Sequence, residues 1–352
     1  MHNYAARYQR VLEEFDEQKI DAFLVSNPLN IRYLTGLCLT DGELVLSPSE
    51  NILFVDSRYL LEAQQHKFDF DIEALQFKDK FKEISAWLND HDFRFIGVES
   101  CYLSHHNFLS WQEKISGRLM LCQSLIEKFR LCKDNSEIEL IQKAIGIVAN
   151  IIKKIPDLLM NGIGLSEREV CLEIEYLIKK EGAERLAFEI IVASGERSAM
   201  PHAAPTERKI KGGEIVLIDM GAVYEGYHSD VTRIFCLGEK KGQLEHILSI
   251  LQSAQTAAIE HIKPGVSAKD IDACARNVIE QAGYGSCFSH GTGHGVGIEV
   301  HEGPWISPAS ESILEEGMVF TLEPGIHSTN FGIRFEDMYI LTKTGLKNLT
   351  EF

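Results

Sequence analysis

Asp219 and Asp230 are the residues whose type and spacing most suggest chemistry, and the turn-forming Gly226 lies between them. An apolar run at 215–218 leads into the first aspartate, and a second run at 231–235 follows the other. Both runs are short and contain β-branched residues, which is typical of buried strands. The segment is therefore predicted to be a β-hairpin with one carboxylate on each arm.

The register of this hairpin decides what the carboxylates can do. If Asp219 faces Asp230, the turn centres between Tyr224 and Glu225, and the two Cβ atoms lie about 5 Å apart. Carboxylates this close repel each other unless a proton or a cation lies between them. A pair of divalent metal ions would satisfy both. The simpler alternative is a solvated hairpin in which both aspartates are ordinary turn residues.

Three histidines, His290, His294 and His301, occur within twelve residues, among glycines at 291, 293, 295 and 297. Glycine lets the backbone approach a ligand closely, and histidine is the commonest nitrogen ligand of metals. A phosphate-binding loop is disfavoured because the spacing is not G-x-G-x-x-G and no helix start follows. A tight structural loop with incidental histidines is the other alternative. His294 and His301 differ in parity, so both can line one site only if a bulge or turn intervenes, at Gly295 or Gly297.

Two more carboxylates stand at the ends of apolar runs. Glu323 ends the run that starts at Met318, and the Pro-Gly that follows it breaks a strand. Glu336 shares a strand face with Arg334, because the two are two positions apart. Taken singly, such a carboxylate is more often a strand-end residue that meets solvent. Taken together with the aspartates and histidines, they predict an oxygen-rich metal site, which suits Mn or Co better than sulfur-ligated zinc.

Composition limits the partners and the compartment. The formal net charge of −17 argues against nucleic acid and anionic membrane surfaces, since both attract basic patches. None of the eight cysteines forms a C-x-x-C pair, which disfavours a thiolate zinc site and is typical of a reducing compartment. The amino terminus has no apolar leader, and no apolar run approaches the ~18 residues of a membrane span. We therefore expect a cytoplasmic protein.

Strands and helices alternate in the first part of the chain, which indicates an α/β domain. Its helices are predicted at 5–19, 57–63 and 81–88, and its strands at 20–25, 43–47, 51–56 and 94–98. The second part has two capping-box sequences, Ser136–Glu139 and Ser166–Glu169, and a third helix start at Ser267. Its strands are predicted at 187–193, 214–219, 231–236, 317–323 and 333–341. We expect an α/β domain over 1–124 and an α+β domain over 125–352.

On these residues the sequence resembles the pita-bread metallopeptidases, specifically the group of Xaa-Pro aminopeptidase (aminopeptidase P) and Xaa-Pro dipeptidase (prolidase). The first domain resembles the creatinase-type N-terminal domain of that group. The matching runs stand in the family's order and cover the second domain: Ala193-Ser-Gly195, Pro201-His202, Ile218-Asp-Met-Gly221, Ser229-Asp-Val-Thr-Arg233, His290-Gly-Thr-Gly-His-Gly295, Val300-His-Glu302, Leu322-Glu-Pro-Gly325 and Arg334-Phe-Glu-Asp337.

The resemblance implies two divalent metal ions, with Mn the first expectation and Co or Zn the alternatives. The implied ligands are Asp219, Asp230, His294, Glu323 and Glu336, with Asp230 and Glu336 bridging. A metal-bridging hydroxide would be the nucleophile, and Glu323 would also shuttle protons. The resemblance further implies that His202 and His301 stabilise the tetrahedral intermediate. It places His290 and Arg334 in the substrate-binding site. His290 would contact the proline side of the substrate, and Arg334 would support the bridging carboxylates.

The implied reaction is hydrolysis between an N-terminal residue and a following proline. This bond needs a dedicated site because proline lacks an N–H. We expect an Xaa-Pro aminopeptidase, since Tyr33-Leu-Thr-Gly36 and His301-Glu-Gly-Pro304 resemble that branch. The alternatives are a prolidase, which must hold the free carboxylate of proline, a non-catalytic peptide-binding protein, and a metal-free creatinase-like hydrolase. The resemblance also implies a homodimer.

Two departures from the family's pattern bear on the pocket. His327 replaces a frequent aromatic residue, and Phe331-Gly332 replaces a double glycine. Either change would alter the pocket rim or the metal affinity, and neither removes a ligand.

Overall fold

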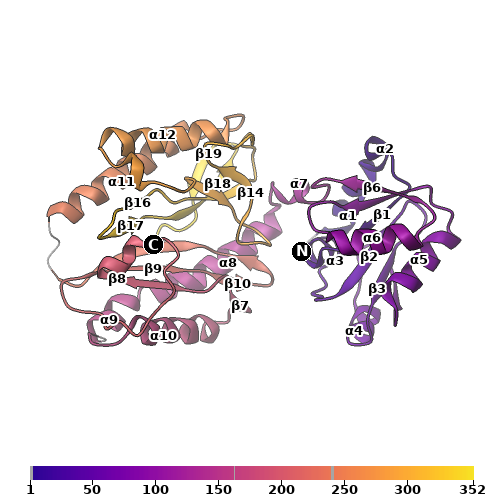
Figure 1. The fold of residues 1–352 in the computed structure, drawn as a ribbon, viewed down its shortest axis with the longest axis horizontal. Helices are drawn as coiled ribbons and strands as arrows, with labels where there is room; N and C mark the ends of the chain where they lie inside the picture. The colour runs from indigo at the N-terminus through magenta and orange to yellow at the C-terminus, as the bar shows by residue number, and fades with distance from the viewer. Residues whose placement is uncertain (1–2, 162, 239–241) are drawn as a thin grey trace. The chain divides into compact units, whose positions relative to one another are not determined.

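The computed structural model describes residues 3–161, 163–238 and 242–352, and the chain divides into two compact units, Met1–Arg130 and Leu131–Phe352 (Figure 1). The division falls a few residues after the expected position 124, because α7 (Glu127–Arg130) is bonded to the first unit. The Arg130 guanidinium donates to Asn30 Oδ1 at 2.9 Å, and the Tyr33 hydroxyl donates to the Phe129 carbonyl at 3.2 Å. None of the helices in these described ranges has the length and apolar character needed to cross a membrane.

A mixed six-stranded sheet forms the first unit, in agreement with the predicted α/β class. Its order is β4-β3-β2-β1-β5-β6, antiparallel from β1 to β3 and parallel elsewhere. The strands are β1 (Ala22–Val25), β2 (Gly42–Leu46), β3 (Ile52–Val55), β4 (Glu73–Gln76), β5 (Phe95–Glu99) and β6 (Arg118–Cys122). The helices before α7 are α1 (Tyr4–Glu13), α2 (Phe15–Gln18), α3 (Pro28–Thr35), α4 (Leu60–Gln65), α5 (Lys80–Asp90) and α6 (His105–Lys114).

The second unit places helices outside and strands inside (Figure 1). Apolar side chains of α8 and α10 pack with β8 and β9 in one core, and those of α11 and α12 pack with β15 and β18 in another. The helices are α8 (Asn135–Ile152), α9 (Ile155–Asn161), α10 (Glu167–Lys180), α11 (Gly242–His261) and α12 (Ala268–Gln281), with 3₁₀ turns η1 (Gly195–Ala199) and η2 (Gly285–Cys287).

Hairpins build the sheets of the second unit, as predicted for an α+β domain. The described strand orders are β11-β10-β7, β12-β9-β8, β14-β13-β15-β18-β19 and β16-β17. The strands are β7 (Arg185–Leu186), β8 (Ile191–Ser194), β9 (Ile215–Met220), β10 (Ala222–Tyr224), β11 (Tyr227–His228), β12 (Val231–Cys236), β13 (Gly293–Gly295), β14 (Glu302–Ile306), β15 (Val319–Leu322), β16 (Gly325–His327), β17 (Gly332–Arg334), β18 (Asp337–Thr342) and β19 (Gly345–Asn348).

The predicted helix starts agree with the structure to different degrees. The capping box at Ser166 and Glu169 is present. The prediction for α8 was wrong by two residues, because the box is formed by Asp134 and Glu137. Asp134 carries a carboxylate that accepts the Glu137 N–H at 2.9 Å, so it caps the helix before Ser136 can. Ser267 is the N-cap of α12 but makes no capping bond through its side chain.

Candidate metal centre

The hairpin that carries the two aspartates has a different register from the predicted one. β9 pairs with β12 so that Asp219 lies opposite Thr232, and not opposite Asp230. The turn centres between Glu225 and Gly226, one residue later than predicted. Their φ values of 45° and 88° fit the two-residue turn that matches the twist of a hairpin. The backbone conformation of this turn therefore shifts the register by two positions.

Both aspartates still face one site. Continuing the register places Asp230 opposite Gly221, two positions from Asp219 and on the same strand face. A Cβ on Gly221 would lie 2.1 Å from the Ser229 carbonyl oxygen, so only glycine permits the arms to approach this closely. Asp219 and Asp230 are 7% and 4% exposed. The hairpin thus carries two buried carboxylates side by side along one face.

A bulge brings His294 and His301 to the same site, and this prediction is confirmed. The register between β13 and β14 shifts between His294 and Gly295: His294 pairs with Trp305, and Gly295 pairs with Glu302. The His294 and His301 ring centroids are 4.4 Å apart. A Cβ on Gly295 would lie 1.9 Å from the carbonyl oxygen of the facing strand, which explains the glycine there.

Glu323 and Glu336 enter the site from the ends of β15 and β17. The Glu323 N–H donates to the Thr292 carbonyl at 2.8 Å, which fixes the turn away from the strand. Thr232 donates its hydroxyl to Glu336 Oε2 at 2.6 Å and accepts from Arg334 Nε at 3.0 Å. Thr232 thus holds both Glu336 and Arg334, a role that its sequence position did not reveal.

Arg334 is the cation of the site. Its guanidinium is 4% exposed, donates through Nη2 to Asp219 Oδ2, and lies with Nε 4.0 Å from Glu323 Oε2. Its Nη1 donates to the Pro201 carbonyl at 3.3 Å, beside His202. Arg334 therefore braces carboxylates of the cluster and is committed to protein acceptors.

The structure brings all five predicted ligands into one cluster. Three overlapping groups have ligand atoms within 4.8 Å of one another: Asp219 with Asp230 and Glu336, His294 with Glu323 and Glu336, and Asp230 with His294 and His301. His294 Nε2 lies 3.6 Å from Asp230 Oδ2 and 3.5 Å from Glu323 Oε1. His301, predicted as a catalytic residue, lies as close as the predicted ligands.

The chemistry of the cluster fits divalent cations. Oδ1 of Asp219 and Oδ1 of Asp230 are buried without any hydrogen-bond donor, which is costly unless a cation is the partner. Burial, reinforced by neighbouring carboxylates, raises the pKa of Asp230 and of Glu336 well above the ordinary range. Burial raises the pKa of Glu323 to about 7 and lowers that of His294, which keeps its imidazole neutral. Neutral imidazole is the form that binds metal, and a cation would replace the protons that the crowded carboxyl groups otherwise hold.

The comparisons with known proteins agree with this site. A sequence profile described as metallopeptidase family M24 matches residues 139–343, and one described as Creatinase/Prolidase N-terminal domain matches residues 7–132. A Pyrococcus furiosus protein named Xaa-Pro dipeptidase is 37% identical over 98% of this chain and 97% of its own length. The chain belongs to metallopeptidase family M24.

Solved structures share the whole M24 architecture. A structure titled Xaa-Pro dipeptidase from Bacillus anthracis has a TM-score of 0.94 at 34% identity and covers 99% of this chain and 98% of its own. One titled X-Pro aminopeptidase from Thermotoga maritima has a TM-score of 0.89 at 34% identity, with 98% of each chain covered. The pita-bread fold of the second unit and the creatinase-type fold of the first are therefore established.

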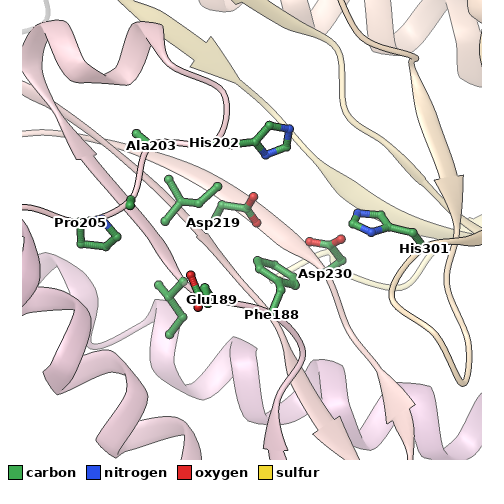
Figure 2. Close-up of a pocket in the computed structure, with 11 residues that line it drawn as sticks. Phe188, Glu189, His202, Ala203, Pro205, Asp219, Asp230 and His301 are labelled. Atoms are coloured by element: carbon green, nitrogen blue, oxygen red, sulfur yellow. The ribbon is translucent and has the colours of Figure 1, made fainter.

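Two cavities meet at the M24 metal cluster. The first, here called the apolar cavity, has a volume of about 280 Å³ (Figure 2). Its walls combine apolar residues with the cluster, and they are Phe188, Glu189, Ile190, Ile191, His202, Ala203, Ala204, Pro205, Asp219, Asp230 and His301. Figure 2 shows His202 beside Asp219 and His301 beside Asp230. Both predicted catalytic histidines thus flank the aspartate pair.

The second, here called the histidine cavity, has a volume of about 230 Å³. It shares His202, His301 and the aspartates with the apolar cavity, and adds Pro201, His290, Gly291, Gly293, His294, Trp305, Ser307, Glu323, Arg334 and Glu336. His290 is predicted on the proline side of the substrate, and burial lowers its pKa to about 4. Its Nδ1 pairs with the Gly291 carbonyl at 2.8 Å, and its Nε2 is buried without a partner.

Of the two departures from the family's pattern, His327 lies beside the histidine cavity and Phe331 lies beside α11. His327 packs its ring 5.7 Å from that of His290, and both of its nitrogens are buried without a hydrogen-bond partner. Gly332 is the position that must be glycine, since a Cβ there would lie 2.0 Å from the Ser198 carbonyl oxygen. Phe331 packs against the core beside α11. The change from glycine to Phe331 therefore leaves the close approach intact.

An ion pair on α12 holds the segment that carries His290, and sequence reasoning missed it. Arg276 Nε lies 2.8 Å from Asp272 Oδ2, and the guanidinium also donates to the Phe288 and His290 carbonyls, both at 2.8 Å. Asp272 Oδ1 accepts from Thr292 N at 3.1 Å and Oγ1 at 2.8 Å. The signal was the spacing of four residues on a predicted helix, which pairs opposite charges. The network fixes the main chain between His290 and the metal cluster.

Proposed function

We propose that this chain is an Xaa-Pro dipeptidase that hydrolyses the bond between a first residue and proline. The observation that carries the proposal is the convergence of Asp219, Asp230, His294, Glu323 and Glu336, with two buried aspartate oxygens that have no donor. Relatives of matching length bear the name Xaa-Pro dipeptidase at 37% and 36% identity. These relatives favour the dipeptidase over the aminopeptidase expected from the sequence.

In this proposal five side chains hold two divalent cations. Asp219, Asp230, His294, Glu323 and Glu336 would hold the two cations, with Asp230 and Glu336 as the carboxylates shared between them. The oxygen-rich set favours Mn. When bound, such a pair of cations activates water at neutral pH and polarises the scissile carbonyl.

The chain's own residues then position the peptide and move its protons. Glu323 takes a proton from the attacking water and delivers it to the proline nitrogen as that amine leaves. His202 and His301, on either side of the aspartates (Figure 2), donate to the carbonyl oxygen as it gains negative charge. His290 packs against the proline ring, and Arg334 keeps Asp219 in place.

A second candidate, an Xaa-Pro aminopeptidase, is favoured by one observation. Among the described residues that line the histidine cavity, Arg334 is the only arginine or lysine, and it is bonded to Asp219. A dipeptidase must hold the free carboxylate of proline, whereas an aminopeptidase leaves this end open for further residues. The aminopeptidase activity would therefore need no cation in the second unit to hold a proline carboxylate.

Peptide length separates the two activities. Release of the first residue is measured from Xaa-Pro, Xaa-Pro amide and Xaa-Pro-Yaa, with chelated enzyme and after Mn is restored. Metal-dependent cleavage of Xaa-Pro alone supports the dipeptidase, and comparable cleavage of all three supports the aminopeptidase. Asp230→Ala is the inactive control. If metal-loaded wild-type enzyme cleaves none of them, the proposal is wrong.

A further inference from the structure

The two cavities differ in the residues that line them, and this difference divides a dipeptide between them. The apolar cavity has no lysine or arginine among its described lining residues, and its only carboxylate outside the aspartate pair is Glu189. The histidine cavity contains His290, against which the proposed function places the proline ring. The proline end therefore belongs in the histidine cavity, and the side chain of the first residue belongs in the apolar cavity.

Away from the metal cluster, the wall of the apolar cavity consists of apolar side chains and one exposed carboxylate, Glu189. Ile190, Ile191 and Ala203 are buried in its wall at 1%, 8% and 3% exposure, and Phe188 is half-buried. Glu189 is exposed. Within the described chain Glu189 makes no hydrogen bond or ion pair, so its carboxylate is available to a ligand. Figure 2 shows Phe188 and Glu189 on the wall across from His202.

A side chain that matches this cavity has an alkyl stem and a cationic end. Lysine and arginine bury their methylene groups against apolar surface and keep the charge in water, and a neighbouring aromatic ring adds a cation–π surface. We propose that Glu189 makes the enzyme prefer a basic first residue before proline. This inference rests on the proposed cleavage of Xaa-Pro bonds, and it names the substrate class that the site favours.

The test compares lysyl-proline with norleucyl-proline, which differ only in the terminal ammonium group. The ratio of their kcat/KM values is measured for wild-type enzyme, for Glu189→Gln and for a matched control, Glu196→Gln. Glu196 is also an exposed carboxylate, and it lies outside the apolar cavity. An exposed ion pair changes a rate ratio up to about fivefold. We expect wild-type and Glu196→Gln enzymes to prefer lysyl-proline about threefold, and Glu189→Gln to lose this preference.

Salt provides a second readout, since 0.5 M NaCl should reduce the wild-type preference by screening the exposed pair. An unchanged ratio in Glu189→Gln, or an equal loss in Glu196→Gln, would overturn the inference. Failure of the proposed function is distinguishable, because norleucyl-proline would then not be cleaved at all. In that case calorimetric binding of the same two dipeptides to the same three proteins decides the role of Glu189. Binding without a preference that depends on Glu189, or no binding of either dipeptide, counts against it.

Discussion

Mild acid usually destabilises a folded protein, but once metal is removed it should stabilise the second unit. The cluster holds four carboxylates against the single guanidinium of Arg334. Burial raises the pKa of Glu323 from 4.5 to about 7, so between these values the folded state keeps a proton that the unfolded state has lost. The stability that this Glu323 proton contributes is fully present below pH 4.5 and is lost as the pH rises through about 7.

The magnitude follows from the size of this shift. The interval from 4.5 to about 7, at about 1.4 kcal/mol per pKa unit, corresponds to about 3 kcal/mol. Asp230 and Glu336 act in the same direction, because their pKa values are raised too. His294 has the opposite effect on stability, because burial lowers its pKa and the folded state gives up its proton more readily than the unfolded state. The carboxylates outnumber it, so the metal-free unit should be more stable at pH 5.5 than at pH 7.5.

Hydrogen exchange measures this unit by itself. Amides of β9 and β15 are followed by mass spectrometry in chelated protein at both pH values, with rates referred to unstructured peptide at the same pH. We expect more protection at pH 5.5, by about twentyfold from Glu323 alone, a smaller response in chelated Glu323→Gln, and none of this preference after Mn is restored. Lower protection of the chelated wild type at pH 5.5, or an undiminished response in Glu323→Gln, would refute the reasoning.

Three further predictions separate the roles of single residues. Asp230→Ala should lose bound metal together with activity, whereas His301→Ala should keep metal and lose about 10²-fold in kcat; equal metal loss in both would contradict this division. Arg276→Lys should destabilise the protein by about 1–3 kcal/mol and raise KM, because lysine cannot donate to both main-chain carbonyls at once. Chemical denaturation measures the first effect and steady-state kinetics the second. An unchanged KM would mean that the network contributes only to stability. Burial raises the pKa of Glu99 to about 7, so the first unit should lose stability as the pH rises from 4.5 to 7. Urea unfolding followed by tryptophan fluorescence measures this loss, and Glu99→Gln should make the stability depend less on pH.

Asp219 and Glu323 could be singled out because apolar runs lead into them, whereas the full ligand set was implied by the family resemblance. Glu323 lies between a buried strand and the chain-breaking Pro-Gly, and Asp219 ends a run of buried β-branched residues. The parity of His294 and His301 required an irregularity, and the register shift lies at one of the two glycines that the pattern indicated. The division between ligand and catalyst stays a prediction, because His301 shares one cluster with Asp230 and His294.

Other features depend on contacts that a linear pattern does not contain. The hairpin register follows from the positive φ of Glu225, a residue type that rarely adopts it. The helix α3 was not predicted, although Asn27 caps it and Pro28 occupies its first turn, where a missing N–H costs nothing. The helix α11 was missed, although Ile247, Leu251 and Ala254 mark its buried face.

The irregular β14 also protects the enzyme in a way unrelated to catalysis. β14 is the end strand of a five-stranded sheet, and an end strand offers its free backbone groups to other chains. Pro304 removes one donor from this strand, and the bulge between His294 and Gly295 interrupts the even ladder beside it. The strand is therefore a poor template for the addition of a foreign strand. The distortion that gathers two histidines at one cavity thus also resists edge-to-edge aggregation.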